Sequence, residues 1–145
     1  VLEARGYQGG KVIARKRVET TGAPAAVRLS PDRRVLTADG RDVAVVTVSV
    51  VDSRGRHVPV AGNEIQFALA GAGAIIGVGN GDPSCHEPDK YLAASVEHPW
   101  KRSLFNGLAQ IIVQAGKQPG KLRLQATAEG LQACAVSFRC ERSGT

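Results

Sequence analysis

Apolar and polar residues alternate along most of this chain, which is the pattern of β-strands that bury one face. In the run 43–51 every residue is apolar, Thr or Ser, and valine takes most of the positions, so a strand is favoured over a helix. The residues that fall on one face of their runs are Ala44, Val46, Val48, Val50, Ile65, Phe67, Leu69, Ala109, Ile111, Val113, Leu122, Leu124, Ala126, Ala128, Cys134, Val136, Phe138 and Cys140. About seven short strands are predicted, over 27–29, 43–51, 65–69, 74–78, 105–113, 122–128 and 134–140.

Turn-forming residues separate these strands at near-regular intervals, and no convincing amphipathic helix is found. The turns are predicted at 52–55, 118–120 and 129–130, where Gly, Pro and Asp gather. Short strands with such turns are typical of two antiparallel sheets packed face to face. We therefore predict an all-β, immunoglobulin-like antiparallel sandwich. Unequal strand lengths argue against a closed barrel, and the lack of strand–helix alternation argues against an α/β fold.

The N-terminal part follows a different pattern. Two strands around Gln8-Gly9-Gly10 predict a hairpin, and the stretch 21–24 is predicted to be a linker. An isolated hairpin is only marginally stable in water. We therefore expect residues 1–22 to close a preceding domain or to dock on the sandwich, and residues 23–145 to form the sandwich module.

Length and composition suit one globular domain, since the chain has 145 residues of which 43% are hydrophobic. Methionine is absent, also at position 1, so we expect a segment of a longer protein. Any leader of that protein cannot be read from this sequence, and a bacterial periplasmic or secreted location is our expectation for it.

The net charge of +6 raises the question of nucleic-acid binding. The basic residues are spread along the chain, and the densest run is only Arg15 to Arg17. Aromatic residues make up 4%, too few for the stacking platforms of single-strand binders. No run approaches the ~18 apolar residues of a membrane helix. Neither nucleic acid nor a membrane is therefore expected as a partner.

Three cysteines occur, and this odd number does not make a disulfide framework. Cys134 and Cys140 lie in one predicted strand, about 20 Å apart at ~3.3 Å per residue, so they cannot bridge each other. Cys85 could meet either of them, but we expect free thiols.

Catalytic signatures are absent from the sequence: it has no nucleophile elbow, P-loop or zinc-protease helix. The acidic residues mostly fall in predicted turns, where carboxylates are usually solvated. We predict no catalytic residue, no cofactor and no metal site. A calcium site at Asp39 with Asp42, or at Asp82 with Glu87 and Asp89, is the weaker alternative.

The segment 80–102 lacks strand periodicity and contains the only tryptophan. Loops of this length are uncommon in compact domains and are often functional. An aromatic ring flanked by hydrogen-bonding groups suits a sugar. The candidate carbohydrate-binding residues are Trp100, Tyr91, Asp82, His86 and Glu87. Alternatively, Trp100 folds inward and caps the sandwich, or it seals a contact with a neighbouring domain.

Several stretches carry a family resemblance, at 36–48, 52–59, 61–67, 77–90 and 102–109. The most specific are Gly-Asn-Gly-Asp-Pro at 79–83 and Phe-Asn-Gly at 105–107. Together they resemble the C-terminal immunoglobulin-like domains of glycoside hydrolase family 2, in particular bacterial β-galactosidases. Residues 2–21 resemble the closing strands of the domain that precedes this module in such enzymes.

The resemblance implies a parent hydrolase whose two catalytic glutamates lie in an upstream TIM barrel, so no catalytic residue is transferred to this chain. It implies a non-catalytic accessory domain with a structural, domain-packing role. Its expected partners are other domains of the same parent chain, and a glycan is the second expected contact. Two alternatives remain open. The first is an autonomous carbohydrate-binding module. The second is an adhesin-like structural repeat, because the Asp39-Gly40 strand opening also resembles intimin-type repeats.

Overall fold

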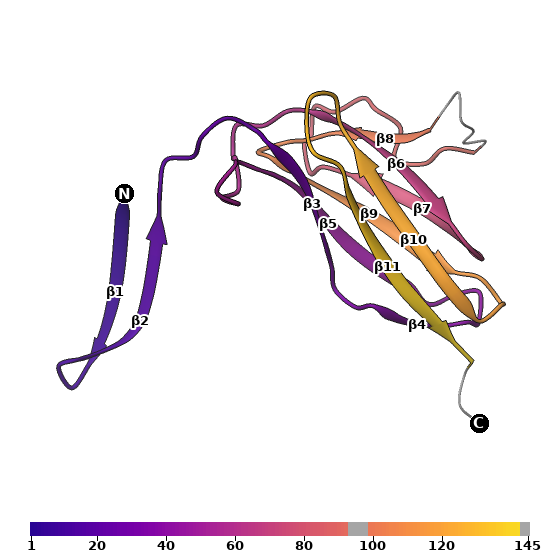
Figure 1. Ribbon diagram of the computed structural model, residues 1–145, viewed down its shortest axis with the longest axis horizontal. Coiled ribbons are helices and arrows are strands. Elements are labelled where there is room, and N and C mark those ends of the chain that lie inside the picture. Colours follow the sequence, from indigo (N-terminus) through magenta and orange to yellow (C-terminus); the bar gives the residue numbers. More distant parts are fainter. Residues whose placement is uncertain (93–98, 143–145) are drawn as a thin grey trace.

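The computed structural model of the protein describes residues 1–92 and 99–142, and these residues form strands and no helix (Figure 1). The strands are β1 (Leu2–Gln8), β2 (Lys11–Val18), β3 (Ala26–Pro31), β4 (Val35–Thr37), β5 (Val43–Val51), β6 (Glu64–Ala70), β7 (Gly73–Gly79), β8 (Trp100–Ser103), β9 (Leu108–Ala115), β10 (Gly120–Thr127) and β11 (Cys134–Glu141). Across the described ranges there is accordingly no helix able to cross a membrane.

Two sheets make up the sandwich. One has five strands in the order β4-β11-β10-β6-β8, and the other has four in the order β3-β5-β9-β7. All neighbours are antiparallel except β4, which runs parallel to the end of β11. The prediction of an all-β, immunoglobulin-like sandwich with an N-terminal hairpin is confirmed, and the one parallel pair is a departure from the all-antiparallel sheets that we expected.

The core lies between the sheets and is filled by the alternating residues that the sequence placed on one face. In β5 every second residue from Ala44 to Val50 is buried, and in β10 Leu122, Leu124 and Ala126 are buried. Phe138 of β11 is the largest apolar side chain among the fully enclosed ones. Burial of each such Leu, Val, Ile or Phe contributes about 1.5–3 kcal/mol, so this interdigitated layer stabilises the sandwich.

Two strands of the sandwich were missed by the sequence analysis, β4 and β8. They have three and four residues, too few to display an alternation. The expectation of a loop over the whole of 80–102 was therefore wrong at its end, because Trp100 to Ser103 pair with β6 as an edge strand. Residues 93–98 of that segment lie outside the described residues.

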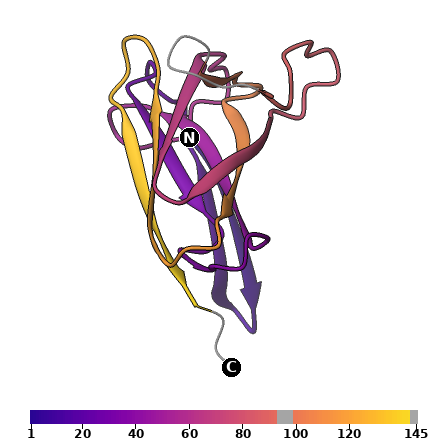
Figure 2. The ribbon, with the colours of Figure 1, turned by 90° about the vertical axis from the view of Figure 1, so that its right-hand side faces the viewer.

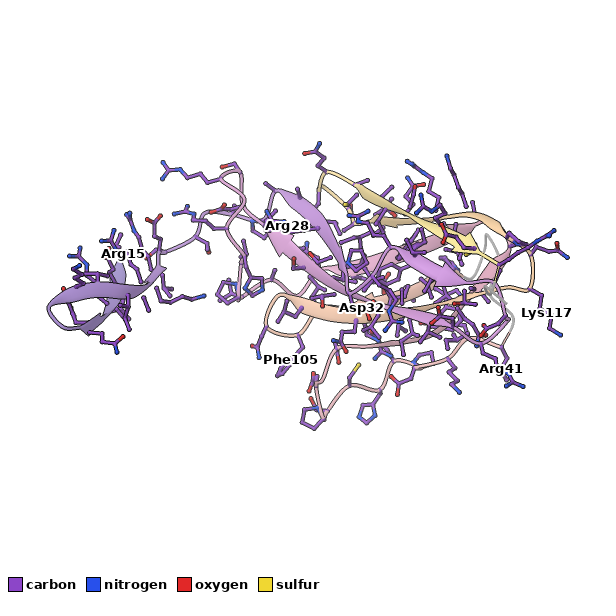
Figure 3. All side chains as sticks on the ribbon, turned by 90° about the horizontal axis from the view of Figure 1, so that it is seen from below. Arg15, Arg28, Asp32, Arg41, Phe105 and Lys117 are labelled. Atoms are coloured by element: carbon purple, nitrogen blue, oxygen red, sulfur yellow. The ribbon has the colours of Figure 1, made fainter. Side chains whose placement is uncertain are left out.

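The hairpin β1–β2 forms a sheet of its own and stands apart from the sandwich (Figure 1). Nearly all of its residues are exposed, including Leu2, Tyr7 and Ile13, each more than half exposed. Figure 3 places Arg15 of the hairpin far from Arg41 and Lys117 at the opposite end of the molecule. The hairpin therefore buries no apolar face within this chain.

Asp52 ties the linker after the hairpin to the sandwich. Its buried carboxylate accepts the Gly22 N–H at 2.9 Å, the N–H groups of Arg54 and Arg56 and the guanidinium of Arg56. The bond from Gly22 is the main cause that holds the pKa of Asp52 well below its ordinary value; burial opposes this shift, and the bonds from Arg56 and Arg54 add to it. The predicted turn at 52–55 is thus present, and it also anchors the linker.

Asn106 and Gly107 form the tight turn between Phe105 and β9. Both have positive φ, 52° and 72°, as the two central residues of a type I′ turn require. A Cβ at Gly107 would lie 2.1 Å from the carbonyl oxygen of Val58. Only glycine fits here, because the turn needs both the left-handed backbone and the close approach.

We expect Gly107→Ala to lower the free energy of unfolding by about 3 kcal/mol, since left-handed strain and overpacking add. Gly81→Ala is the matched control, because Gly81 also has positive φ, 75°, but open space around its Cβ position. The control should cost about 1 kcal/mol. Urea unfolding of the two variants measures the difference, and equal losses would refute the close approach at Val58.

Asp52→Asn should destabilise the protein at pH 7 and change its acid sensitivity. A carboxyl with a lowered folded pKa contributes stability that is present above its unfolded value, 3.8, and is lost as the pH falls below it. The stability gap between wild type and Asp52→Asn should therefore close as the pH falls below about 4. Denaturant unfolding from pH 7 to pH 3 tests this, with Glu129→Gln as an exposed control; a constant gap would contradict it.

Candidate functional site

Arg102 of edge strand β8 is buried, with 1% of its surface exposed, and organises the segment 80–92. Its Nη2 donates to the carbonyl oxygens of Val78 at 3.2 Å and Pro88 at 3.0 Å, and to Asp89 Oδ1 at 2.6 Å. Its Nη1 lies 3.0 Å from Cys85 Sγ. One guanidinium thus holds together an edge strand of each sheet and the loop between them.

A buried guanidinium needs its charge balanced and its donors satisfied. Asp89 balances the charge directly, and Glu87 Oε2 lies 3.8 Å from the Arg102 Nε, the atom without a hydrogen bond. Arginine suits this position because its planar fork spreads five donors over three nitrogens, whereas a lysine ammonium offers three donors from a single atom.

Glu87 fixes the loop to the backbone of β8. Its carboxylate accepts hydrogen bonds from the N–H of Ser103 at 2.8 Å and from the Ser103 hydroxyl. Partial burial of the Glu87 carboxyl is the largest influence and raises its pKa, but the bonds from Ser103 and the charges of Arg102 and Lys101 outweigh it. The pKa of Glu87 is lowered as a result, so Glu87 is an anionic anchor.

The start and end of the loop are also hydrogen-bonded to strands. Asn80 Nδ2 donates to the Ser103 carbonyl at 2.9 Å, and the Val78 N–H donates to the Asp89 carbonyl at 3.0 Å. Asp82 accepts from the N–H and hydroxyl of Ser84, which lowers its pKa. In Figure 2 this loop projects to the upper right, beyond the strands.

Tyr91 and Trp100 pack together at the open edge of the sandwich. Their ring centroids are 5.0 Å apart with planes tilted by 58°, and both rings lie against the core. The Tyr91 hydroxyl donates to the Lys101 carbonyl at 3.2 Å, and burial raises the pKa of Tyr91. The two rings line a hollow of about 630 Å³ together with Phe67 and Ile75.

The predicted site residues do not form one site. Tyr91 and Trp100 line the hollow just described, whereas Asp82 lines another of about 800 Å³ beside β7. Glu87 is half-buried as an anchor, and His86 is exposed. The inward packing of Trp100 matches the alternative in which this ring covers the core.

The thiols and the calcium candidates have ordinary structural surroundings. Cys85, Cys134 and Cys140 are free, as predicted.

Asp39, one of the calcium candidates, accepts backbone N–H bonds from Arg41 and Asp42. Within 1–92 and 99–142, no group of three or more His, Cys, Asp or Glu side chains could hold a metal ion.

Arg102 is the residue that sequence reasoning missed. It stands two positions after Trp100, so both side chains point to the inner face of β8. That spacing was a usable signal, but it required recognising a four-residue strand.

The comparison with known families decides what this domain is. The model of glycoside hydrolase family 2, C-terminal domain 5, matches residues 27–137, which is most of the chain. The chain belongs to glycoside hydrolase family 2. It corresponds to the C-terminal domain 5 of that family, and the matched region coincides with the sandwich, beginning after the hairpin and linker.

Relatives of this family-2 domain are much longer proteins. A β-galactosidase of Bacteroides ovatus is 41% identical over 134 residues, which cover 92% of this chain and 15% of the relative. A β-glycosidase structure from Bacteroides vulgatus matches 94% of this chain and 17% of its own with a TM-score of 0.86 and 25% identity. A family-2 member from Bacteroides cellulosilyticus matches 97% and 17%, with a TM-score of 0.82 and 26% identity.

Arg102→Met should release the loop and lower the free energy of unfolding by about 2 kcal/mol, because the carbonyl oxygens of Val78 and Pro88 lose their donor. Arg123→Met, on the solvent face of β10, is the control and should change stability by less than about 0.5 kcal/mol. Denaturant unfolding and proteolysis within 80–92 are the measurements. Equal behaviour of the two variants would rule out the anchoring role.

Proposed function

We propose that this chain is a non-catalytic accessory domain of a longer family-2 glycoside hydrolase, with a structural role in packing against the rest of that enzyme. Its relatives with curated names include β-galactosidases, so a β-galactosidase is the parent that we propose. The chain spans 15% of the Bacteroides ovatus relative, which leaves the chemistry to the other domains of such a protein.

The state of the carboxylates is the observation that carries this proposal. Glycoside hydrolysis needs one carboxyl with a raised pKa as general acid and a second carboxylate within about 5–9.5 Å. In this domain the pKa values of four carboxyls are lowered: those of Asp39 and Asp52 mainly by backbone N–H groups, that of Asp82 by the hydroxyl and N–H of Ser84, and that of Glu87, against its partial burial, by the hydroxyl and N–H of Ser103. These four carboxylates are suited to anchoring turns and loops, and their lowered pKa values make them poor general acids.

The hairpin supports a packing role. It leaves apolar side chains such as Leu2, Tyr7 and Ile13 in solvent, and an isolated two-stranded sheet is marginal in water. Matches to solved family-2 structures extend over 97% of the chain and so include most of the hairpin, whereas the domain model begins at residue 27. We infer that residues 1–22 complete a sheet of the preceding domain.

Carbohydrate contact is the second candidate, because Tyr91 and Trp100 line a hollow that is open to solvent. Both rings are also packed against the core, which leaves less of each face for a sugar. This candidate therefore stands behind the packing role.

Assaying the purified 145-residue chain with p-nitrophenyl β-galactoside tests the absence of catalysis; we expect no release of nitrophenol. In the full-length parent, deleting residues 23–145 should lower the midpoint of thermal unfolding while both barrel glutamates remain. Hydrolysis by the chain alone, or an unchanged midpoint after the deletion, would refute the accessory role.

Titrating the same chain with galactose and galactan while following Trp100 fluorescence tests the second candidate. We expect no change up to millimolar sugar. A saturable fluorescence change, together with a calorimetric binding isotherm that Trp100→Phe weakens and Phe105→Leu leaves in place, would establish a carbohydrate-binding module instead.

A further inference from the structure

The outer faces of the two sheets differ in chemistry. The five-stranded sheet presents charged side chains to solvent: Lys121, Arg123, Arg139, Glu141, Glu64 and Lys101. The four strands of the other sheet contain one charged residue, Arg28, whose guanidinium turns to the Gly55 carbonyl at 3.0 Å. A sheet face in permanent contact with water normally carries charged and polar side chains, whereas this face combines a single charged residue with uncharged polar residues (Thr47, Ser49, Gln110 and Gln114) and apolar ones.

Apolar β-branched residues form one end of this outer face, beside the polar pair Thr47 and Gln110. Val45 of β5 lies directly opposite Ile112 of β9, and Val43 lies one pair further along the same face. Ile76 of β7 and Ile112 line the same hollow. All four are half-buried by their neighbours, and Leu108 at the end of β9 is 40% exposed. Over residues 43–46 the strand β5 thus has apolar residues on both sides, as strands do when both faces are covered.

A fixed wall borders this face. The hollow of about 800 Å³ has Ile76, Ile112 and Gln110 on its sheet side and Pro83 and Asp89 of the loop on the other. Arg102 holds that loop in place through Asp89 and Pro88, as described above. The surface is therefore preorganised, so a partner that docks there orders few side chains and loses little conformational entropy.

We propose that the outer face of the sheet β3-β5-β9-β7, together with the wall formed by residues 82–90, docks another domain of the same glycoside hydrolase chain. This rests on the proposed function. The chain covers 15% of its Bacteroides ovatus relative, so most of such an enzyme lies outside this domain and can supply the covering surface. Four strands and about seven residues per strand give a face on the order of 400 Å². Inter-domain interfaces bury about 300–750 Å² on each side, so the face has the size that such a contact requires.

The composition of the face favours a protein surface over a sugar. None of the aromatic residues of the chain lies on these four strands, and a sugar ring needs an aromatic platform. The occupant that fits is an apolar, uncharged patch of a neighbouring domain, since a buried unpaired charge against Val45 and Ile112 would be costly.

The test uses the full-length enzyme and a pair of lysines on this face, Val45→Lys with Ile112→Lys. The matched control is Gln125→Lys with Ala135→Lys, a directly opposed pair on the outer face of the five-stranded sheet. We expect the Val45/Ile112 variant to be cleaved by a non-specific protease in the linker 19–25 at least tenfold faster than wild type, because the domain is released. The control should be cleaved at the wild-type rate. Urea unfolding of the 145-residue chain with each pair checks that both variants fold.

Three results would overturn the docking face. If both pairs leave the linker protected, the face is free in the enzyme; the accessory role still stands provided that deleting residues 23–145 lowers the unfolding midpoint. If the wild-type linker is already cleaved as fast as in the variant, nothing covers the face. If light scattering shows that the isolated chain dimerises and the Val45/Ile112 lysines abolish the dimer, the occupant is a second copy.

Discussion

The buried guanidinium of Arg102 is the interaction on which the open edge of this sandwich depends. Elsewhere the two sheets are joined by apolar side chains, but at this edge Arg102 of β8 bonds to the Val78 carbonyl of β7 in the opposite sheet. The same group binds Asp89 and the Pro88 carbonyl, so the loop is fixed by the residue that joins the sheets. A charge in this position is stable only because nearly all of its donors have acceptors, and this requirement determines one loop conformation.

The acidic residues of the domain have corresponding roles as anchors. Asp52 binds the linker through Gly22, and Glu87 binds β8 through Ser103. The Gly22 N–H for Asp52 and, against its partial burial, the Ser103 hydroxyl and N–H for Glu87 stabilise the anionic form and lower the carboxyl pKa. These anchors lie at the same end of the sandwich and keep the linker and the loop in defined positions relative to the sheets. This rigidity suits the packing role proposed above.

The outer faces of the two sheets differ in the charge that they present to solvent. The charged face of the five-stranded sheet is compatible with permanent contact with water, whereas the face of the four-stranded sheet carries one charged residue and an apolar cluster at Val43, Val45 and Ile112. Along the same chain, the hairpin leaves its apolar residues exposed and pairs with nothing in the sandwich. Both features are explained together if the domain is one part of a larger packed assembly, joined to it through its N-terminal strands and through one sheet face.

The sequence by itself determined the fold class, the hairpin and seven of the sandwich strands. It could do so because side chains in a strand alternate with a period of two. The buried face can therefore be recognised within one short segment, as in Ala44 to Val50 or Leu122 to Ala126. Motif resemblance likewise identified family 2, which the family match confirms. Only the tertiary structure revealed the strand β8 and the role of Arg102. It also showed that Tyr91 and Trp100 line a different hollow from Asp82. These depend on contacts between residues far apart in the chain, such as Arg102 with Val78, and a four-residue edge strand carries too little periodicity to reveal them.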